Sequence, residues 1–123
     1  MTNPLSIVVL QYLGAYEKKN RDALEAVLSA DFTFTSPVDD HIDRQAYFER
    51  CWPNNAGRKS FRVEKFFSEG NECFVTYEGE RTSGAKFRNT EFIRIENGQI
   101  THIDVYFGPD QGDTPFPHVP PPS

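Results

Sequence analysis

Apolar positions in the first thirty residues follow a helical period. The first helix is predicted over 4–19, with a buried stripe formed by Leu5, Val8, Val9, Tyr12, Leu13 and Tyr16. Asn20 interrupts this pattern and can cap a second helix that ends near residue 30. The apolar face of that helix consists of Ala23, Leu24, Val27 and Leu28. Two consecutive helices therefore open the chain.

The segment Phe32–Pro37 alternates apolar and polar side chains and is closed by proline, which is typical of a strand. A loop over 38–41 follows. A third helix is predicted from Asp43, a capping residue, to Trp52, because Pro53 cannot continue it.

The rest of the chain alternates with period two. Four strands are predicted over 61–68, 72–82, 86–96 and 100–107, and Gly70-Asn71, Ser83-Gly84 and Asn97-Gly98 supply the turns between them. Because helices come first and an antiparallel meander second, the fold class is α+β. Residues 108–123 hold six prolines and almost no apolar periodicity. We expect one domain over 1–107 and a Pro-rich extended or disordered tail over 108–123.

The composition of the chain argues against several classes of function. A chain of 123 residues with 37% hydrophobic residues can form one core, and eleven Phe, five Tyr and one Trp suit the lining of a cavity. A net charge of −5 without a dense basic cluster argues against nucleic-acid binding. We expect no membrane association and a cytoplasmic location, because no signal pattern or long apolar run is present. Cys51 and Cys73 are expected to be reduced thiols, and no metal site is expected.

Three stretches resemble the NTF2-like superfamily, in particular its SnoaL-like and ketosteroid-isomerase-like domains. They are NRDALEAVLSADFTF (20–34), IDRQAYF (42–48), with Asp43 where that family usually has glycine, and EFIRIENGQI (91–100) continuing to Tyr106-Phe107. The resemblance covers nearly everything before Gly108. It implies a cone of three N-terminal helices packed on a curved, mainly antiparallel sheet with an internal pocket.

A pair of glutamates is the sharpest candidate for chemistry. If Gly84-Ala85 form a two-residue loop, Glu78 lies opposite Glu91. Glu91 belongs to the more apolar alternate set of its strand, so both carboxyls are predicted inside, with Phe74 and Thr76. Buried like charges favour retention of a proton, which suits acid/base catalysis. The alternative is a different register that turns one glutamate outward to pair with Arg81 or Arg88.

The resemblance implies the same role for Glu91. Glu91 aligns with the carboxylic acid of the oxyanion hole in steroid isomerases of this family. This chain differs from those enzymes at two positions. Ser36 occupies the position of their catalytic Asp, and Gly14, which lies between Tyr12 and Tyr16, occupies the position of their helix-one Tyr. The epoxide-hydrolase pattern also lacks its arginine, so no complete catalytic set transfers.

The last hairpin poses a second question of register. An unbulged Asn97-Gly98 turn would bring Asp104 opposite Glu91, with His102 on the same face. We favour a bulge instead, because Ile103, Val105 and Phe107 form a better inward face. His102, Asp104 and Tyr106 would then point outward. In the loop over 38–41, His41 is either a general base at the pocket mouth or a solvated residue.

The predicted site joins the two glutamates to a ligand-binding wall. Glu91 and Glu78 are the catalytic candidates. The predicted wall consists of Trp52, Ser36, Phe34, Thr76, Asn89, Tyr16, Val105 and Phe107. We expect a small, mostly apolar ligand, no cofactor, and an acid/base isomerase, cyclase or hydrolase. The alternative is a non-catalytic ligand-binding or dimerisation module. A homodimer through the sheet is expected, with Val75, Tyr77 and Phe92 as its apolar patch.

Overall fold

The computed structural model describes residues 4–110, apart from the side chains of residues 58 and 59. The helices are α1 (Pro4–Glu17), α2 (Arg21–Val27), α3 (Arg44–Arg50) and the short 3-10 helix η1 (Trp52–Gly57). The strands are β1 (Leu28–Ser36), β2 (Asp39–Asp43), β3 (Arg58–Glu69), β4 (Glu72–Arg81), β5 (Lys86–Glu96) and β6 (Gln99–Asp110).

Two predicted helix caps are confirmed. The Asn20 side chain accepts a hydrogen bond from the Ala23 amide (3.1 Å), and Asp43 accepts one from the Ala46 amide (2.8 Å). Each bond satisfies an amide that the first helical turn leaves without a partner. Helix α2 is shorter than predicted, because the backbone is already extended at Leu28, where β1 begins.

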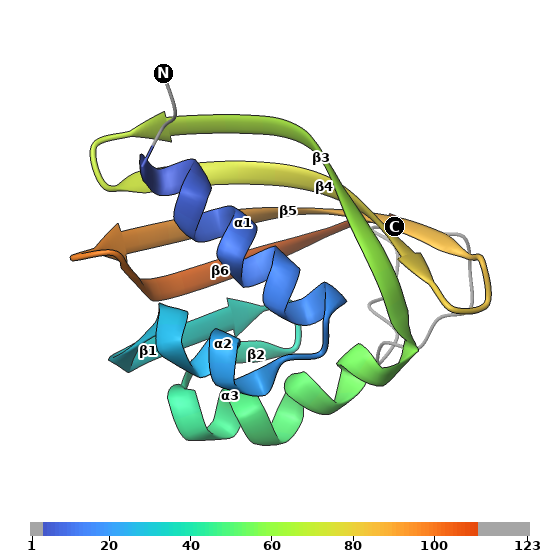
Figure 1. The fold of residues 1–123 in the computed structure, drawn as a ribbon, viewed down its shortest axis with the longest axis horizontal. Coiled ribbons are helices and arrows are strands. Elements are labelled where there is room, and N and C mark those ends of the chain that lie inside the picture. Colours follow the sequence, from blue (N-terminus) through green and yellow to red (C-terminus); the bar gives the residue numbers. More distant parts are fainter. Residues whose placement is uncertain (1–3, 111–123) are drawn as a thin grey trace.

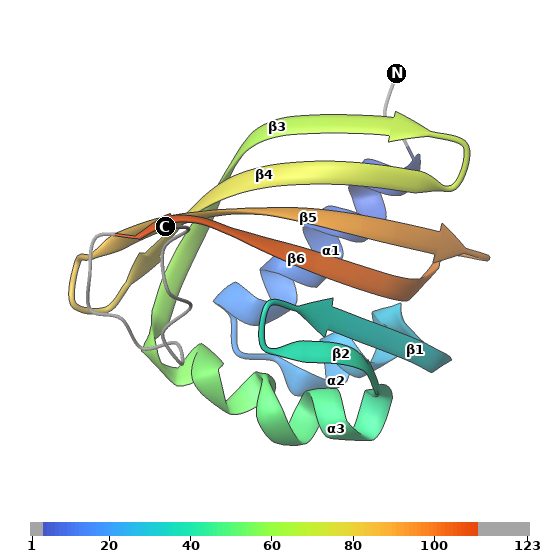
Figure 2. The same ribbon diagram turned by 180° about the vertical axis from the view of Figure 1, so that it is seen from behind.

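All six strands belong to one curved sheet in the order β2-β1-β6-β5-β4-β3. Strand β1 runs parallel to β6, and the other pairs are antiparallel. Helix α1 crosses one face of the sheet, with α2 and α3 beside it (Figure 1). Figure 2 shows β3 to β6 from behind, with α1 on the far side. The predicted α+β architecture is therefore confirmed, but β2 falls where a loop was predicted.

The hairpin between β5 and β6 contains the predicted bulge. Its register shifts between Arg94 and Ile95, which places Ile103 opposite Ile93 and Val105 opposite Glu91. Ile103 and Val105 are buried with the core. Alternate residues of β6, from His102 to Tyr106, therefore lie on the other face, as the apolar pattern predicted.

The hairpin between β4 and β5 differs from the prediction. Its loop has three residues, 82–84: the Arg81 amide donates to the Ala85 carbonyl (2.9 Å), and Gly84 adopts a φ of +94°. Glu78 consequently lies opposite Arg88, not Glu91. This odd shift exchanges the two faces of β4, so Val75 and Tyr77 are buried inside, whereas Phe74 and Thr76 lie outside with Glu78.

Strand β6 continues past the predicted domain end. It runs to Asp110, whose carboxylate accepts two hydrogen bonds from the Arg81 guanidinium, at 2.9 and 2.7 Å. Residues 108–110 of the predicted tail thus belong to the sheet. The remainder of that tail, 111–123, lies outside the described residues.

Candidate functional site

A cavity of about 360 Å³ lies between helices α1 and α3 and the concave face of the sheet. Its volume is within the range of small-molecule sites. Its walls come from segments far apart along the chain: Tyr12, Tyr16, Phe34, Ser36, Val38, Asp39, Tyr47, Arg50, Cys51, Asn54, Tyr77, Asn89, Glu91, Val105 and Phe107.

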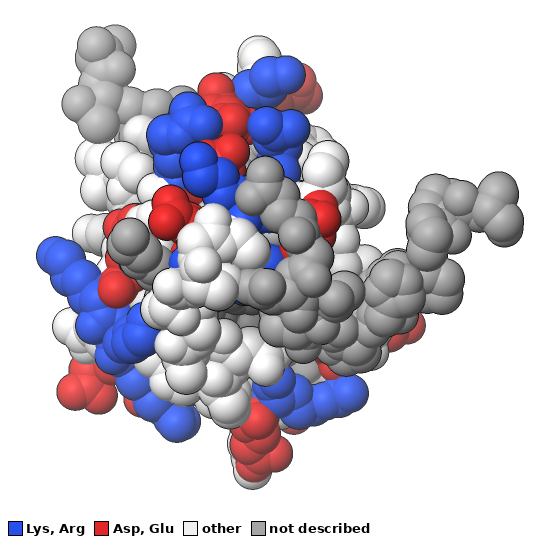
Figure 3. Space-filling model, turned by 90° about the vertical axis from the view of Figure 1, so that its right-hand side faces the viewer, with Lys and Arg blue, Asp and Glu red and all other residues white. Residues whose placement is uncertain are grey.

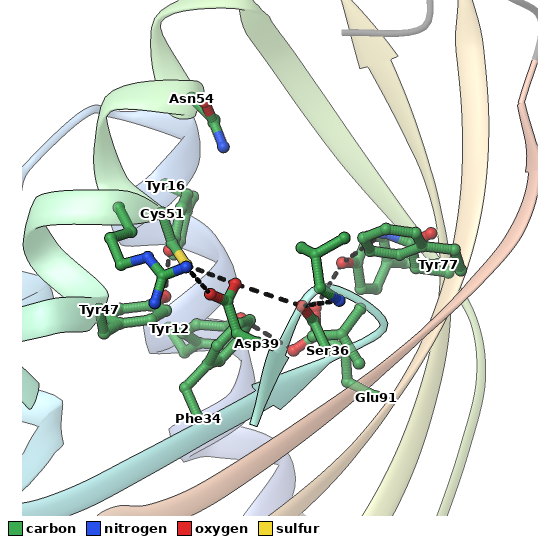
Figure 4. A pocket seen from close by; sticks show the side chains of 15 residues that line it. Tyr12, Tyr16, Phe34, Ser36, Asp39, Tyr47, Cys51, Asn54, Tyr77 and Glu91 are labelled. Atoms are coloured by element: carbon green, nitrogen blue, oxygen red, sulfur yellow. Dashed lines mark hydrogen bonds and ion pairs between the residues drawn. The ribbon is translucent and has the colours of Figure 1, made fainter. Parts of the chain in front are cut away.

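Glu91 lines the cavity from β5, with 2% of its surface exposed. Both carboxylate oxygens accept hydrogen bonds from tyrosine hydroxyls. Tyr12 of α1 donates to Oε1 (2.8 Å), and Tyr77 of β4 donates to Oε2. Asn89 in turn donates to the Tyr77 hydroxyl (3.4 Å). In Figure 4 the two tyrosines approach Glu91 from different sides. These bonds compensate for the loss of water around a buried carboxylate.

A second tyrosine pair lies beside the first. The hydroxyls of Tyr16 and Tyr47 are hydrogen-bonded to each other. Burial, followed by the negative charge of Glu91, raises the pKa of Tyr12 well above its ordinary value. Burial, followed by the neighbouring Tyr16, raises the pKa of Tyr47 in the same way. Both hydroxyls therefore stay protonated near neutral pH and can act as hydrogen-bond donors.

A second carboxylate, Asp39, reaches the cavity from β2. Its side chain is largely buried and forms an ion pair with Arg50 at the end of α3 (2.9 Å). The Ser36 hydroxyl donates to Asp39 Oδ2 (3.3 Å), and the Cys51 thiol lies 4.0 Å from the same oxygen. Figure 4 shows this group beside the tyrosines. The cavity therefore combines two carboxylates with protonated hydroxyls.

Seven of the ten predicted site residues line this cavity. They are Glu91, Ser36, Phe34, Asn89, Tyr16, Val105 and Phe107. Their catalytic or ligand-binding roles stay predictions.

Three placements were wrong. Glu78 lies on the outer face, near Arg62 (3.4 Å) and Lys86 (3.9 Å), because of the three-residue loop. Thr76 is on the same face, hydrogen-bonded to Thr90 (2.7 Å). Trp52 is not part of the cavity wall; its ring packs behind the wall, 5.1 Å from that of Tyr16.

Apart from Tyr16, the tyrosine network was missed, and so was Asp39. Tyr12 was visible only as part of the buried stripe of α1, and Tyr47 only as a residue of the predicted third helix. Tyr77 was assigned to the wrong face, and Asp39 to the loop over 38–41. His41, the candidate from that loop, lies on the outer side instead, where its ring stacks on His102 (5.2 Å).

Within residues 4–110, no group of three or more His, Cys, Asp or Glu side chains is arranged to hold a metal ion. No helix in this part of the chain is long and apolar enough to span a membrane. On the face in Figure 3, acidic and basic side chains are interspersed among uncharged ones.

Comparisons with solved structures agree with the observed architecture. An NTF2-like protein of unknown function from Cytophaga hutchinsonii is 26% identical, with a TM-score of 0.73 over 89% of this chain and 94% of that one. A proposed ketosteroid isomerase from Kribbella flavida is 15% identical, with a TM-score of 0.72 over 98% and 84%. A proposed polyketide cyclase from Sinorhizobium meliloti is 16% identical, with a TM-score of 0.67 over 85% and 100%. At such identities the last two show the fold alone.

A search of curated proteins found no match. The family model of the SnoaL-like domain matches residues 9–103, which is most of the chain and includes most of the cavity wall. The chain therefore belongs to the SnoaL-like domain family, with the NTF2-like fold that its sequence resembles.

Proposed function

We propose that this protein binds a small, mostly apolar molecule in the cavity and catalyses proton transfer on it, as an isomerase, cyclase or hydrolase without a cofactor. One observation carries the proposal: Glu91 is buried at the cavity wall, and both of its oxygens are held by tyrosine hydroxyls. A carboxylate fixed in this way is suited to take a proton from a bound molecule and return it. The same fold occurs in a proposed ketosteroid isomerase and a proposed polyketide cyclase, so the scaffold is compatible with this class of reaction.

The surrounding groups have roles that fit proton transfer next to a carbonyl. Glu91 takes a proton from the carbon beside the carbonyl, and the electron pair moves onto the carbonyl oxygen. A protonated hydroxyl of the Tyr16–Tyr47 pair is placed on the same wall and can donate to that oxygen. Return of the proton at the same carbon, or at another carbon, completes exchange or isomerisation. Asp39 is a second base for a substrate bound nearer to Arg50.

Hydrogen–deuterium exchange tests this proposal without knowledge of the natural substrate. Small cyclic and aromatic ketones are incubated with the protein in D₂O, and loss of the α-proton signal is followed by NMR. We expect catalysed exchange for at least one compound and a decrease of about 100-fold or more in Glu91→Gln. Glu78→Gln is the matched control: this outward glutamate is near basic side chains on the same sheet, and its replacement should leave the rate unchanged.

The alternative function is non-catalytic ligand binding. Chemical-shift changes at the cavity residues without proton exchange in any compound would favour this alternative. Equal exchange rates in the wild type and Glu91→Gln would contradict the assignment of Glu91.

We also propose a homodimer through the outer face of the sheet, in the cytoplasm. The apolar patch differs from the predicted one, because Val75 and Tyr77 are buried inside. It consists instead of Phe67, Phe74, Phe92 and Tyr106. Phe74 lies opposite both Phe67 and Phe92, and Tyr106 lies opposite Thr90, two residues from Phe92 along β5. Phe67 is 71% exposed, Tyr106 56% and Phe74 48%. A second copy would remove these side chains from water.

Sedimentation velocity tests the homodimer. The wild type is expected to sediment as a dimer, and Phe74→Glu as a monomer, because the variant places a charge within the patch. Leu10→Glu is the control, since Leu10 is also an exposed apolar residue but lies on α1, away from the patch. A monomeric wild type, or a dimer lost only in Leu10→Glu, would rule out this interface.

A further inference from the structure

The cavity wall is rich in aromatic side chains. Six of its fifteen lining residues carry aromatic rings: Tyr12, Tyr16, Phe34, Tyr47, Tyr77 and Phe107. The face of such a ring carries partial negative charge and attracts cations, including alkylammonium groups that have apolar surfaces of their own. Aromatic side chains thus favour both the apolar part and the charge of an organic cation.

The formal charges of the lining residues sum to a negative value. Two are acidic, Glu91 and Asp39, and Arg50 is the one basic residue among the described residues that form the wall. Arg50 has a side chain that is 56% exposed and lies at 2.9 Å from Asp39, so its charge is directed to Asp39 and to solvent. The wall therefore carries one net negative charge, and Glu91 is its most deeply buried charged group.

The neighbours of Glu91 respond to this negative charge. After burial, the charge of Glu91 is the next cause of the raised pKa of Tyr12, and likewise of the Cys73 thiol on β4. Each of these groups keeps its proton to a higher pH, because its own anion would be repelled by the charge of Glu91. An anionic ligand would be repelled for the same reason, whereas a cation would be attracted, because the charge of the buried Glu91 is screened less than that of an exposed carboxylate.

We infer that the cavity selects a small organic cation, an alkylammonium compound whose apolar groups contact the aromatic wall and whose charge is attracted by Glu91. The inference rests on the proposed small-molecule site and names its ligand class. It requires no catalytic step. A compact tertiary or quaternary ammonium group meets both requirements, since it carries a charge but few or no N–H groups to satisfy.

Choline and 3,3-dimethylbutan-1-ol provide a test because they have the same shape and differ mainly in the charged nitrogen. Both are titrated into ¹⁵N-labelled wild-type protein, and the shifts of cavity amides are followed. We expect choline to bind about tenfold or more tightly than the neutral alcohol. In Glu91→Gln this preference should largely disappear, whereas Glu78→Gln should retain it, since Glu78 lies on the opposite face of the sheet.

The wild-type comparison keeps the test decisive even if Glu91→Gln does not fold. Equal or stronger binding of the neutral alcohol overturns the cation preference and leaves the proposed small-molecule site intact. Failure of both compounds to shift the cavity amides also overturns it. If the ketones used for proton exchange then fail to bind as well, the proposed function fails with it.

Discussion

The two faces of the same sheet contain the same kinds of residue but give them different environments. On the concave face, Glu91 is buried and held by neutral tyrosine hydroxyls. On the outer face, Glu78 lies one strand away, near the basic side chains of Arg62 and Lys86. The difference shows that strand register, which decides the face, determines whether a glutamate forms part of a site or of a solvated surface.

The largest expected difference between the two faces is in packing. Ile93 is fully buried on the inner face, and its neighbour Arg94 lies outside, in an ion pair with Glu72 (3.0 Å). Ile93→Ala should lower the free energy of unfolding by about 2–5 kcal/mol, because it removes buried methyl groups and leaves a cavity. Arg94→Ala should lower it by less than about 1 kcal/mol. Urea denaturation measures both, and similar losses would contradict the assigned faces.

A smaller difference is expected between the two glutamates. Glu91→Gln leaves two tyrosine hydroxyls competing for one carbonyl oxygen, and the new amide group needs an acceptor of its own. We expect a loss of about 1–3 kcal/mol in unfolding free energy. Glu78→Gln should change it by less than about 0.5 kcal/mol. Chemical denaturation near neutral pH provides the measurement, and an equal effect of the two substitutions would argue against the tyrosine network.

The smallest expected effect appears only in alkali. Burial, followed by the charge of Glu91, raises the pKa of the Cys73 thiol from 9.0 to about 11. Between these values the unfolded chain releases the thiol proton while the folded chain keeps it. The stabilisation is therefore complete below pH 9 and is lost as the pH rises to about 11. Tyr12 and Tyr47, with raised pKa values, act in the same direction at higher pH.

Urea midpoints measured across this pH range should fall less steeply in Cys73→Ala than in the wild type. If Cys73→Ala declines as steeply as the wild type, the thiol is not the source of the effect.

The contrast between the faces also explains which features could be predicted from the sequence. On β5, Ile93 and Ile95 identify the inner face, so the inward position of Glu91 was predicted correctly, and so was the bulge between Arg94 and Ile95 in the last hairpin. On β4 the set with Cys73, Val75 and Tyr77 is the more apolar one, but the face of Glu78 was inferred from the assumed loop length instead. Ser83-Gly84 is compatible with loops of two or three residues, which place Glu78 on opposite faces.

The remaining errors arise from tertiary contacts. Strand β2 is short and acidic, and its extended form depends on pairing with β1. The sequence alone therefore could not bring Asp39 to the cavity. The contact between Tyr12 and Glu91 joins residues 79 positions apart in the chain, and no local pattern encodes it.

The parallel pairing of β1 with β6 has a consequence for the order in which the protein folds during synthesis. Thr33 contacts His102 across 69 positions of sequence, and β6 lies between the β1–β2 pair and the rest of the sheet. Until the ribosome has released β6, the early helices with β1 and β2 form one incomplete unit, and β3 to β5 another. The nascent chain thus exposes two unpaired strand edges until its last strand emerges, and that strand joins them in a single late step.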